Sequence, residues 1–463
     1  MKILLVQPDS SQKMVGFSKL ILPEPLALEI MAALVPEHEV KILDMRVDPT
    51  LDETIKSFGP DLIGITGYTT YAPRMLQICQ RVKELDPHIC TVLGGYHASL
   101  CPEDFDIESV DVIVVGEGEA TFKELIHAIH KGTDLSTVLG IIYRQDGRAV
   151  ATARRPLISN LNALPLPART LTDHYRPSYH FHFWEGTYLV ETARGCPYRC
   201  TFCAVWKFHQ GKCRVRTPER VVREIETCNT DMICFVDDNF LQSLSRAARI
   251  GDRIAEHGIK KKYWMQARAD SIVRRPDIIA KWADLGLRTI LIGFEKFREE
   301  ELASVNKSGS IKDNEKAMEI MREYDIDMWG AFIVDPEWTT ADFDAAIDYV
   351  KSMKISFPQF TVLTPLPGTD FYREKFDQLI TKNYEIFDFL HTVLPTKLPI
   401  DEFYANMARL YSSTTLSLSE LKKRIRSGHI PISALARVRG LLADVTDPQA
   451  YLRSVPDLDL SRV

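Results

Sequence analysis

Short apolar runs alternate with longer amphipathic segments along residues 1–145. Most of the runs are continuously apolar, which is typical of parallel strands buried on both faces of a sheet. They lie at residues 3–6, 40–43, 62–66, 91–93 and 112–115. Helix-length segments such as 26–35 and 73–85 separate them. This alternation predicts a doubly wound parallel α/β sheet.

A second alternation begins near Tyr188, with expected strands at residues 189–192, 233–236, 263–267, 289–293, 329–334 and 360–363. The helices between these strands carry terminal signals. Thr217 and Pro218 resemble an N-cap followed by a first-turn proline, and Gly258 and Gly286 stand where helices are expected to end. Six strand–helix units in a row predict a barrel or partial barrel, whose chemistry lies at the carboxyl ends of the strands.

The remaining segments differ from both alternations. Residues 140–150 predict a β-hairpin, and a proline-rich passage follows it. From about Phe371 onward the pattern becomes helical, with candidate helices at 400–411 and 418–427. We therefore expect a first domain over residues 1–150, a linker over 151–185, a barrel over 186–372 and a helical region over 373–463.

The composition narrows the classes of function. The 463 residues are 45% hydrophobic and 26% charged, which indicates soluble globular domains. A net charge of -6 gives no reason to expect a nucleic-acid partner. The first apolar run meets Gln7 and Pro8 too early for a secretory signal, and no apolar stretch approaches the roughly 18 residues that span a bilayer. We expect a cytoplasmic protein, peripheral to a membrane if its substrate is a lipid.

Three of the nine cysteines, Cys196, Cys200 and Cys203, stand close together after the first strand of the second alternation. The odd total argues against a disulfide framework. The C-x3-C-x2-C spacing brings three thiolates together on one tight loop, as an iron–sulfur cluster requires, and leaves a fourth iron without a protein ligand. A zinc loop completed by His209 or Cys213 is the alternative.

This loop, with Phe202 before its third cysteine, resembles that of the radical S-adenosylmethionine (SAM) superfamily over roughly residues 186–370. The resemblance implies a partial (β/α)6 barrel, a [4Fe–4S] cluster on the three cysteines and SAM bound to the open iron. Reductive cleavage of SAM would yield a radical that abstracts hydrogen from the substrate, while the protein positions and shields the reagents. Besides Phe202, the implied SAM-binding residues lie at strand ends and are Asp237, Asp238, Asn239, Arg268 and Glu295. Residues 364–369 resemble the turn that closes such barrels.

Three glycine-containing loops follow strands of the first alternation, where open α/β sheets bind their ligands. Glycines allow a backbone to approach a bulky ligand closely. With the barrel that follows, the loops resemble those of the cobalamin-binding radical SAM class, which implies a cobalamin-binding domain. The implied cobalamin-binding residues are Thr66, Gly67, Tyr68, Thr69, Gly94, Gly95, Tyr96, His97, Gly116, Glu117, Gly118 and Glu119. A response-regulator-like domain is the alternative.

Residues 44–48 depart from a motif found in many cobalamin-binding domains. Domains that ligate cobalt with histidine carry D-x-H-x-x-G, whereas residues 44–48 here contain no histidine. We therefore do not expect the lower axial ligand of cobalt from this loop. His97 is a nominee for that role, but a contact with the nucleotide tail is the expected one.

Together the motifs predict an enzyme, a C-methyltransferase that acts on an unactivated carbon. One SAM would methylate cobalamin and a second would generate the radical. A cyclase or rearranging enzyme without methyl transfer shares these motifs, and a non-catalytic cobalamin or Fe–S sensor is the alternative from another class. The aromatic residues Trp206, Phe208, Trp329 and Phe332 are candidates to line a water-poor cavity.

The substrate is a small molecule that the motifs leave unnamed. Residues 398–403 resemble those of family members acting on lipid-like or polycyclic natural products, hopanoid methylases included. A low-potential electron donor such as ferredoxin or flavodoxin is implied, because the cluster must be reduced and the chain shows no flavin motif.

Overall fold

The structure is a computed structural model that describes residues 1–11, 15, 19–415 and 418–453. Contacts between residues divide the chain into two compact units. The first comprises Met1–Gln12 and Glu24–Ser178, and the second comprises Lys13–Pro23 and Tyr179–Val463. The division after Ser178 falls inside the segment expected to be a linker.

The first unit is built on a seven-stranded sheet in the order β3-β1-β4-β5-β6-β7-β8. Its first five strands run parallel, and β7 and β8 form an antiparallel hairpin, so the doubly wound sheet and the hairpin are confirmed. The order of the strands reverses between β1 and β4, and sheets of this topology bind ligands at the carboxyl ends of such a pair. The bounds are β1 Lys2–Gln7, β3 Glu39–Asp44, β4 Leu62–Thr66, β5 Cys90–Gly94, β6 Val112–Val114, β7 Ile141–Gln145 and β8 Arg148–Ala151.

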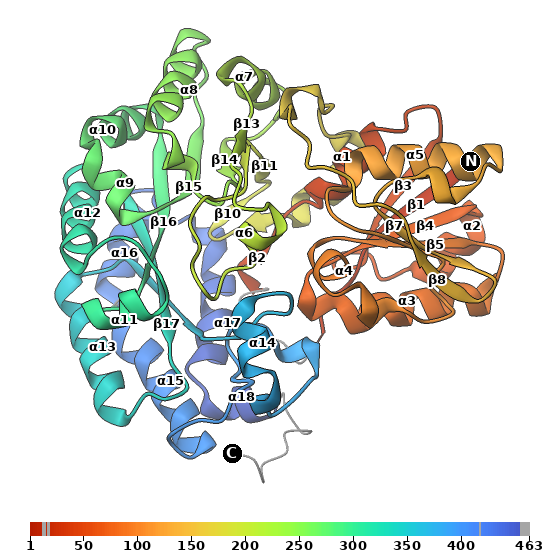
Figure 1. Cartoon of the computed structure of the whole chain (residues 1–463). Coiled ribbons are helices and arrows are strands. Elements are labelled where there is room, and N and C mark those ends of the chain that lie inside the picture. The colour runs from red at the N-terminus through yellow and green to blue at the C-terminus, as the bar shows by residue number, and fades with distance from the viewer. Residues whose placement is uncertain (12–14, 16–18, 416–417, 454–463) are drawn as a thin grey trace. The chain divides into compact units, whose positions relative to one another are not determined.

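Helices cover both faces of this sheet. The helices α1 and α5 lie together on one face, and α3 and α4 lie on the other (Figure 1). Leu28 of α1 and Phe122 and Leu125 of α5 pack with the side chains that β1 and β4 turn toward them. Each such side chain stabilises the layer by ~1.5–3 kcal/mol when it is fully buried. The bounds are α1 Leu26–Ala33, α2 Leu51–Phe58, α3 Ala72–Leu85, α4 Tyr96–Leu100 and α5 Gly118–Lys131.

The second unit is a partial barrel of six parallel strands that pair in chain order. All six predicted strands are present, although the last begins earlier than its apolar run. The two parallel sheets confirm the α/β class. The bounds are β11 Tyr188–Val190, β14 Met232–Phe235, β15 Lys262–Ala267, β16 Leu287–Glu295, β17 Asp327–Val334 and β18 Phe357–Val362.

A series of helices runs round the outside of these strands from α7 through α8, α10 and α12 to α13 (Figure 1). The predicted helix ends are confirmed. Thr217 caps α7 by accepting a hydrogen bond from the Arg220 N–H, and Pro218 opens the helix. Gly286 ends α10 with φ 111°, and Gly258 follows the cap of α8 with φ 63°. The bounds are α7 Pro218–Glu226, α8 Leu244–Glu256, α10 Pro276–Leu285, α12 Ile311–Glu323 and α13 Thr340–Met353.

A small antiparallel sheet absent from the sequence prediction lies beside the amino-terminal halves of β15 and β17. It consists of β2 Ile21–Leu22, β9 His180–Phe181 and β10 Trp184–Glu185. His182, at the turn between β9 and β10, packs on Trp329 and Trp264 with ring centroids 3.7 and 5.4 Å away. Complete burial lowers the pKa of His182 to about 3, so its imidazole is neutral. Aromatic side chains therefore fill this end of the barrel.

One free edge of the barrel is β18, which pairs with β17 alone among the described strands. Alternate residues of a strand turn their backbone groups to opposite sides, and Pro358, Phe360 and Val362 turn theirs away from β17. Pro358 has no N–H. The Tyr411 hydroxyl bonds the N–H and the C=O of Phe360 at 3.1 and 2.7 Å, and the Val362 N–H donates to the Phe389 carbonyl at 2.6 Å. No outward N–H of these three residues is left unpaired.

Beyond β18 the chain forms α14 Asp370–Lys375, passes through irregular turns and ends in helices. The helical C-terminal region is confirmed, and both predicted helices are present. The bounds are α15 Ile400–Thr414, α16 Leu418–Arg426, α17 Leu435–Val445 and α18 Pro448–Arg453. Within the described ranges, none of the helices combines the length and apolar character needed to cross a bilayer.

Candidate functional site

The cysteine loop begins directly after β11, at the carboxyl end of the barrel strands. A short antiparallel ladder, β12 Ala193–Arg194 with β13 Arg214–Val215, closes the two ends of the loop. Gly195 stands between this ladder and Cys196 with φ 86°, and a Cβ there would lie 2.3 Å from the Lys212 carbonyl oxygen. The left-handed backbone and the close carbonyl both require glycine, which explains the Gly-Cys start of the loop.

All three predicted cluster cysteines lie in this loop. Cys200 is buried, and Cys196 and Cys203 are partly exposed. The Cys203 N–H and the Trp206 indole N–H both donate to the Cys200 carbonyl, at 3.2 and 3.1 Å. Burial raises the pKa of each thiol, that of Cys203 to about 12. The thiols must therefore release protons when they bind iron.

The geometry favours a cluster over the zinc alternative. The Nδ1 atom of His209 lies 2.8 Å from the Arg214 guanidinium. In the part of the chain that the structure describes, no three His, Cys, Asp or Glu side chains converge closely enough to hold a single metal ion. The nearest candidate in the sequence for a fourth zinc ligand, His209, is thus engaged by Arg214, which favours the cluster.

Two carboxylates that follow β14 hold the start of this loop. Asp237 is buried and accepts hydrogen bonds from the Thr192 N–H at 2.6 Å, the Ala193 N–H at 2.9 Å and the Thr192 hydroxyl. Asp238 accepts from the Gly195 N–H at 3.1 Å. Desolvation raises the pKa of both carboxyl groups to about 6. Both predicted SAM residues therefore contact the backbone next to the cysteines.

Asn239, the next predicted SAM residue, has an unsatisfied acceptor. Its side-chain nitrogen donates to Gln242 at 3.1 Å, but its Oδ1 is buried and has no hydrogen-bond partner. A buried acceptor left unpaired costs about 1–3 kcal/mol, so such an atom indicates a ligand that donates to it. An ammonium group, as on the amino acid part of SAM, fits this requirement.

Arg268, at the end of β15, lies against the cysteine loop. Its guanidinium lies 3.9 Å from the ring centroid of Tyr198, which stands between the first two cluster cysteines. It also donates to the Asp270 carboxylate at 2.9 Å and to the Ser308 carbonyl. A cation held over an aromatic ring in this way fixes the ring as well as the charge. Arg268 therefore supports the loop from a second strand end.

The end of β16 carries a residue with a strained backbone, Glu295, which pairs with the segment that contacts the loop. Glu295 has a φ of 65°, rare for a residue other than glycine, beside a β-bulge that begins at Gly293. Its carboxylate pairs with Lys307 at 2.7 Å, and a Cβ on Gly293 would lie 2.3 Å from Glu295 Oε1. The adjacent Asn306 side chain donates to the Arg199 carbonyl at 2.8 Å. Three successive strand ends thus support the cysteine loop.

The aromatic residues do not gather as the sequence predicted. Phe202 is partly buried within the loop, and Trp206 and Phe208 lie on the short helix α6 Val205–Phe208 directly after it. Trp329 belongs to the aromatic cluster at the opposite end of the barrel, and Phe332 packs outward against α13. The predicted grouping of four is wrong because side chains alternate between the two faces along β17.

In the first unit, the predicted glycine loops follow β4, β5 and β6. At two of their glycines, neighbouring atoms of the chain leave no room for a side chain. A Cβ on Gly67 would lie 2.7 Å from Tyr71 Cβ, and a Cβ on Gly95, where φ is 103°, would lie 2.7 Å from Thr66 Oγ1. At Gly116, φ is 91° and nothing lies within 4 Å of a Cβ. The backbone at Gly116 is therefore open to a large ligand, as a cobalamin site requires.

His97 is engaged within the chain. Its Nδ1 lies 3.2 Å from Thr69 Oγ1 and its Nε2 lies 3.0 Å from the Asp104 carboxylate, so both ring nitrogens have partners. Arg46 stands where the D-x-H-x-x-G motif has its histidine, and it forms a bidentate ion pair with Asp44 at 2.8 and 2.6 Å. Neither loop presents a free imidazole to cobalt.

The other predicted cobalamin residues lie on the same edge of the sheet. Tyr68 is 65% exposed, and its ring centroid lies 5.9 Å from that of Tyr96. Glu117 is buried and accepts a hydrogen bond from the Ile158 N–H at 2.6 Å. The remaining members are Thr66, Gly94, Gly118 and Glu119. This edge therefore combines a pair of tyrosine rings with buried acids that are bonded within the chain.

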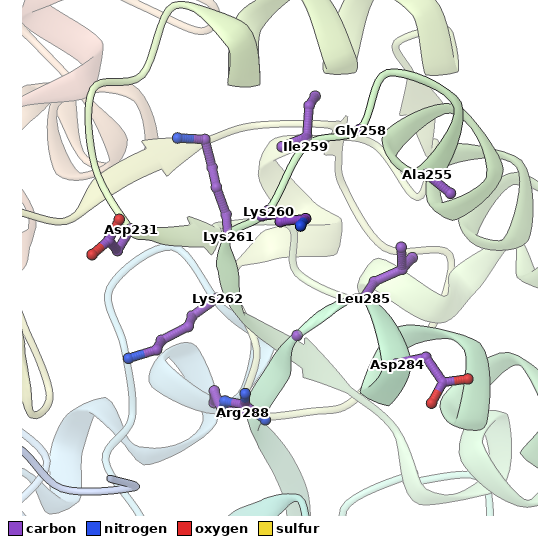
Figure 2. Close-up of a pocket in the computed structure, with 11 residues that line it drawn as sticks. Asp231, Ala255, Gly258, Ile259, Lys260, Lys261, Lys262, Asp284, Leu285 and Arg288 are labelled. Carbon is purple, nitrogen blue, oxygen red and sulfur yellow. The ribbon is translucent and has the colours of Figure 1, made fainter.

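A hollow of about 520 Å³ lies at the opposite, amino-terminal ends of β14, β15 and β16. Its lining includes Lys260, Lys261, Lys262 and Arg288, and the side chains of Lys261 and Lys262 point apart (Figure 2). Lys262 lies over the Trp184 ring, 4.2 Å from its centroid. Barrel enzymes work at the carboxyl ends of their strands, so this hollow is not assigned to the reaction.

Several residues around the cysteines were missed by the sequence reasoning. Arg246 lies on the buried face of α8 together with Ile250 and Ile254. A charged residue on an apolar helical stripe is a signal that could have identified it. Tyr198 and Lys307 carry no such signal, because their roles depend on two loops meeting in space.

Comparisons with known proteins agree with this geometry. Residues 22–126 match the B12 binding domain family, and residues 190–350 match the radical SAM superfamily. The chain is 28% identical over 423 residues to hopanoid C-3 methylase of Methylococcus capsulatus, covering 88% of this chain and 79% of that protein. It is 30% identical over 464 residues to an uncharacterized methyltransferase of Pyrococcus horikoshii, covering 96% and 98%. The solved structure of the radical SAM methyltransferase TsrM from Kitasatospora setae, with tryptophan substrate and a SAM analog bound, matches with a TM-score of 0.69 at 17% identity and covers 98% of each chain.

Proposed function

Because this chain belongs to the radical SAM enzymes that carry a B12-binding domain, we propose that it is a C-methyltransferase acting on an unactivated carbon of a lipid-like or polycyclic small molecule. The cofactors of this family are a [4Fe–4S] cluster, SAM and cobalamin. When bound, the cluster and SAM supply a hydrogen-abstracting radical, and cobalamin supplies the methyl group.

The observation that carries the proposal is the unpaired acceptor beside the cysteine loop. Asn239 Oδ1 is buried and has no partner, and the neighbouring Asp238 bonds the Gly195 N–H. Together they offer an amide oxygen and a carboxylate to the amino group of SAM. A sensor has no need of such acceptors next to its cluster, so this feature favours an enzyme.

The chain's own residues hold, orient and shield the reagents. The cysteines bind iron, and the strand ends keep their loop in place. We assign the cluster to Cys196, Cys200 and Cys203, and contacts with SAM to Phe202, Asp238, Asn239, Arg268 and Glu295, while the buried Asp237, also predicted from the sequence, holds the loop. Most of these side chains are also bonded within the chain, so they position the loop as well as the cofactor.

Cobalamin would bind along the carboxyl edge of β4, β5 and β6. Gly116 leaves open backbone there, and His97 orients the Thr69 hydroxyl through a hydrogen bond. Arg46 stands in place of the motif histidine and is paired with Asp44. This supports the proposal that cobalt would receive no histidine ligand from this loop. The remaining predicted residues on this edge complete the proposed site.

The lipid-like substrate rests on the hopanoid methylase relative and on residues 398–403. An external low-potential donor, ferredoxin or flavodoxin, is proposed because the cluster must be reduced. The location is proposed to be cytoplasmic, with membrane contact if the substrate is a lipid.

The test is anaerobic reconstitution of the full chain with iron and sulfide, followed by addition of cobalamin, a low-potential chemical reductant and SAM labelled with deuterium in its methyl group. For the wild type we expect roughly four irons per chain, bound corrin and 5′-deoxyadenosine. The Cys200→Ala variant should lose the iron and the deoxyadenosine and keep the corrin. With a lipid or polycyclic acceptor, the product should gain the mass of the labelled methyl group.

The other outcomes separate the alternatives. A product without added mass would indicate a cyclase or rearranging enzyme. Deoxyadenosine without bound corrin would exclude the methyltransferase. Iron and corrin without any cleavage of SAM would indicate a sensor.

A further inference from the structure

The hydrogen bonds of Asp237 all go to one short segment of the chain, Thr192 and Ala193. Oδ1 accepts from the Thr192 N–H at 2.6 Å and the Ala193 N–H at 2.9 Å, and Oδ2 accepts from the Thr192 hydroxyl. Thr192 and Ala193 connect β11 to Gly195 and the first cluster cysteine. The side chain of Asp237 is 1% exposed, so little of the carboxylate remains for a ligand.

Arg246 of α8 bonds the same segment from the other side. Its Nη2 donates to the Thr192 carbonyl at 2.6 Å and to the Thr192 hydroxyl at 2.5 Å, and its Nε donates to the Arg216 carbonyl at 3.1 Å. Arg216 lies directly after β13, the strand that receives the chain as it leaves the cysteine loop. Arg246 therefore joins the entry and the exit of the loop.

We propose that Asp237, Thr192 and Arg246 form a clamp that sets the position of the cysteine loop, so that Asp237 is a positioning residue rather than a ligand of SAM. The clamp refines the proposed function, because its role is to hold the thiols where the cluster forms. The Thr192 hydroxyl is its central atom, since it donates to Asp237 and accepts from Arg246.

The charges explain why this clamp uses an acid and a base. Arg246 is 5% exposed, and a guanidinium buried to that degree needs a nearby negative charge. Asp237 supplies that charge through the shared Thr192 hydroxyl. In Asp237→Asn, the amide nitrogen cannot accept a hydrogen bond, so one contact with the Thr192–Ala193 segment is lost and Arg246 loses its counter-charge.

The test uses the full chain in two states. In the iron-free protein, the alkylation rates of Cys196, Cys200 and Cys203 by iodoacetamide report how the loop is held, whatever the enzyme's reaction. In the reconstituted protein, iron content and the electron paramagnetic resonance spectrum of the reduced cluster, with and without SAM, report cluster assembly and SAM binding.

We expect Asp237→Asn and Thr192→Val to alkylate about tenfold faster, the factor that corresponds to losing a hydrogen bond to a charged group. Both should assemble less cluster, while the clusters that do form should keep the wild-type spectral response to SAM. Thr192→Ser keeps the hydroxyl and should restore wild-type behaviour, which separates the clamp from general packing.

Asp388→Asn is the matched control. Asp388 is likewise buried, accepts from the Leu390 and His391 N–H groups at 2.9 and 3.0 Å, and lies outside the clamp. It should lower the melting temperature without changing alkylation or iron content. The clamp is overturned if Asp237→Asn alkylates and assembles iron like the wild type but binds SAM weakly, or if its effects equal those of Asp388→Asn. Neither result would bear on methyl transfer itself.

Discussion

The two units present their ligand-facing edges in different ways. In the first unit, the loops after β4, β5 and β6 are shaped by glycines and aromatic rings, and the open position is bare backbone at Gly116. In the second unit, the cysteine loop is contacted by the buried charged side chains of Asp237 and Arg268 at two strand ends, and Glu295 at a third pairs with Lys307 beside it. Open backbone lets a bulky macrocycle approach closely, whereas a small cluster needs its ligands fixed to a fraction of an ångström.

This difference predicts different responses to mutation. A loop held by a charged network should fail as a unit when one contact is removed, because a buried charge left without its partner is costly. A loop shaped by glycine should lose its ligand-binding form only where an added side chain meets other atoms, and elsewhere should pay only the cost of backbone strain.

The largest effect is expected in the cysteine loop, from Gly195→Ala. Its Cβ would lie 2.3 Å from a carbonyl oxygen that belongs to the same hairpin, at a φ of 86°. We expect loss of most of the cluster, measured as iron per chain after anaerobic reconstitution. Gly211→Ala is the control, because Gly211 also has a positive φ of 67° but nothing within 4 Å of a Cβ. It should cost ~1–2 kcal/mol from backbone strain and keep its cluster. Equal iron in the two variants would contradict the steric argument.

The next effect separates two glycines of the first unit. Gly95→Ala places a Cβ 2.7 Å from Thr66 Oγ1, so it should lower both the melting temperature and the affinity for corrin. Gly116→Ala meets no atoms of the chain, so at a φ of 91° it should cost only the ~1–2 kcal/mol of backbone strain, and it should weaken corrin binding by about tenfold, the cost of roughly 1.4 kcal/mol. Corrin absorbance titrations and thermal melts measure the two effects. Wild-type corrin affinity in Gly116→Ala would remove Gly116 from the site.

A smaller effect concerns a buried carboxylic acid of the first unit, Glu29. Desolvation, and then the neighbouring Glu24, raise the pKa of Glu29 from its usual value to about 8. The folded unit therefore favours the protonated acid, and its stability should fall as the pH rises from about 5 to about 8. Glu29→Gln mimics the protonated form and should flatten this dependence, raising the melting temperature at pH 8 by a few degrees. A melting temperature that falls equally with pH in both proteins would assign the dependence to other groups.

The smallest effect is a predicted absence of change. Arg288 lines the hollow at the amino-terminal ends of the strands, away from the cysteine loop. Arg288→Ala should leave iron content, corrin binding and SAM cleavage at wild-type levels. A marked loss of SAM cleavage with normal iron would show that this end of the barrel contributes to the reaction after all.

The contrast also explains what could be predicted from the sequence. The parallel strands of both sheets were predictable because most of them are buried apolar runs, and the cysteines were predictable because three thiols fall within one short loop. Gly67 and Gly95 were read as room for a ligand, but their Cβ positions are filled by the chain itself. Only the structure distinguishes a glycine that faces its own loop from one that faces open space, as Gly116 does.

Long-range pairings were harder to predict. Asp237 was read as a ligand contact from its place at a strand end, but it bonds Thr192 and Ala193, and Thr192 in turn bonds Arg246 of another element. The sheet formed by β2, β9 and β10 was missed because its strands are only two residues long, which is too short for any periodic signal. Of the C-terminal helices, α15 and α16 were predicted individually, whereas α17 and α18 were covered only by the general helical pattern after Phe371.

The capped edge of β18 bears on how this chain behaves in a crowded solution. A barrel that does not close exposes a strand to which another chain can add, and such growth is a common route to aggregation. Pro358 supplies no donor, and the Tyr411 hydroxyl and the Phe389 carbonyl occupy the donors that follow. An incoming strand would find no free N–H along these residues to start a ladder. The fold therefore leaves this edge of the barrel without a template for self-association.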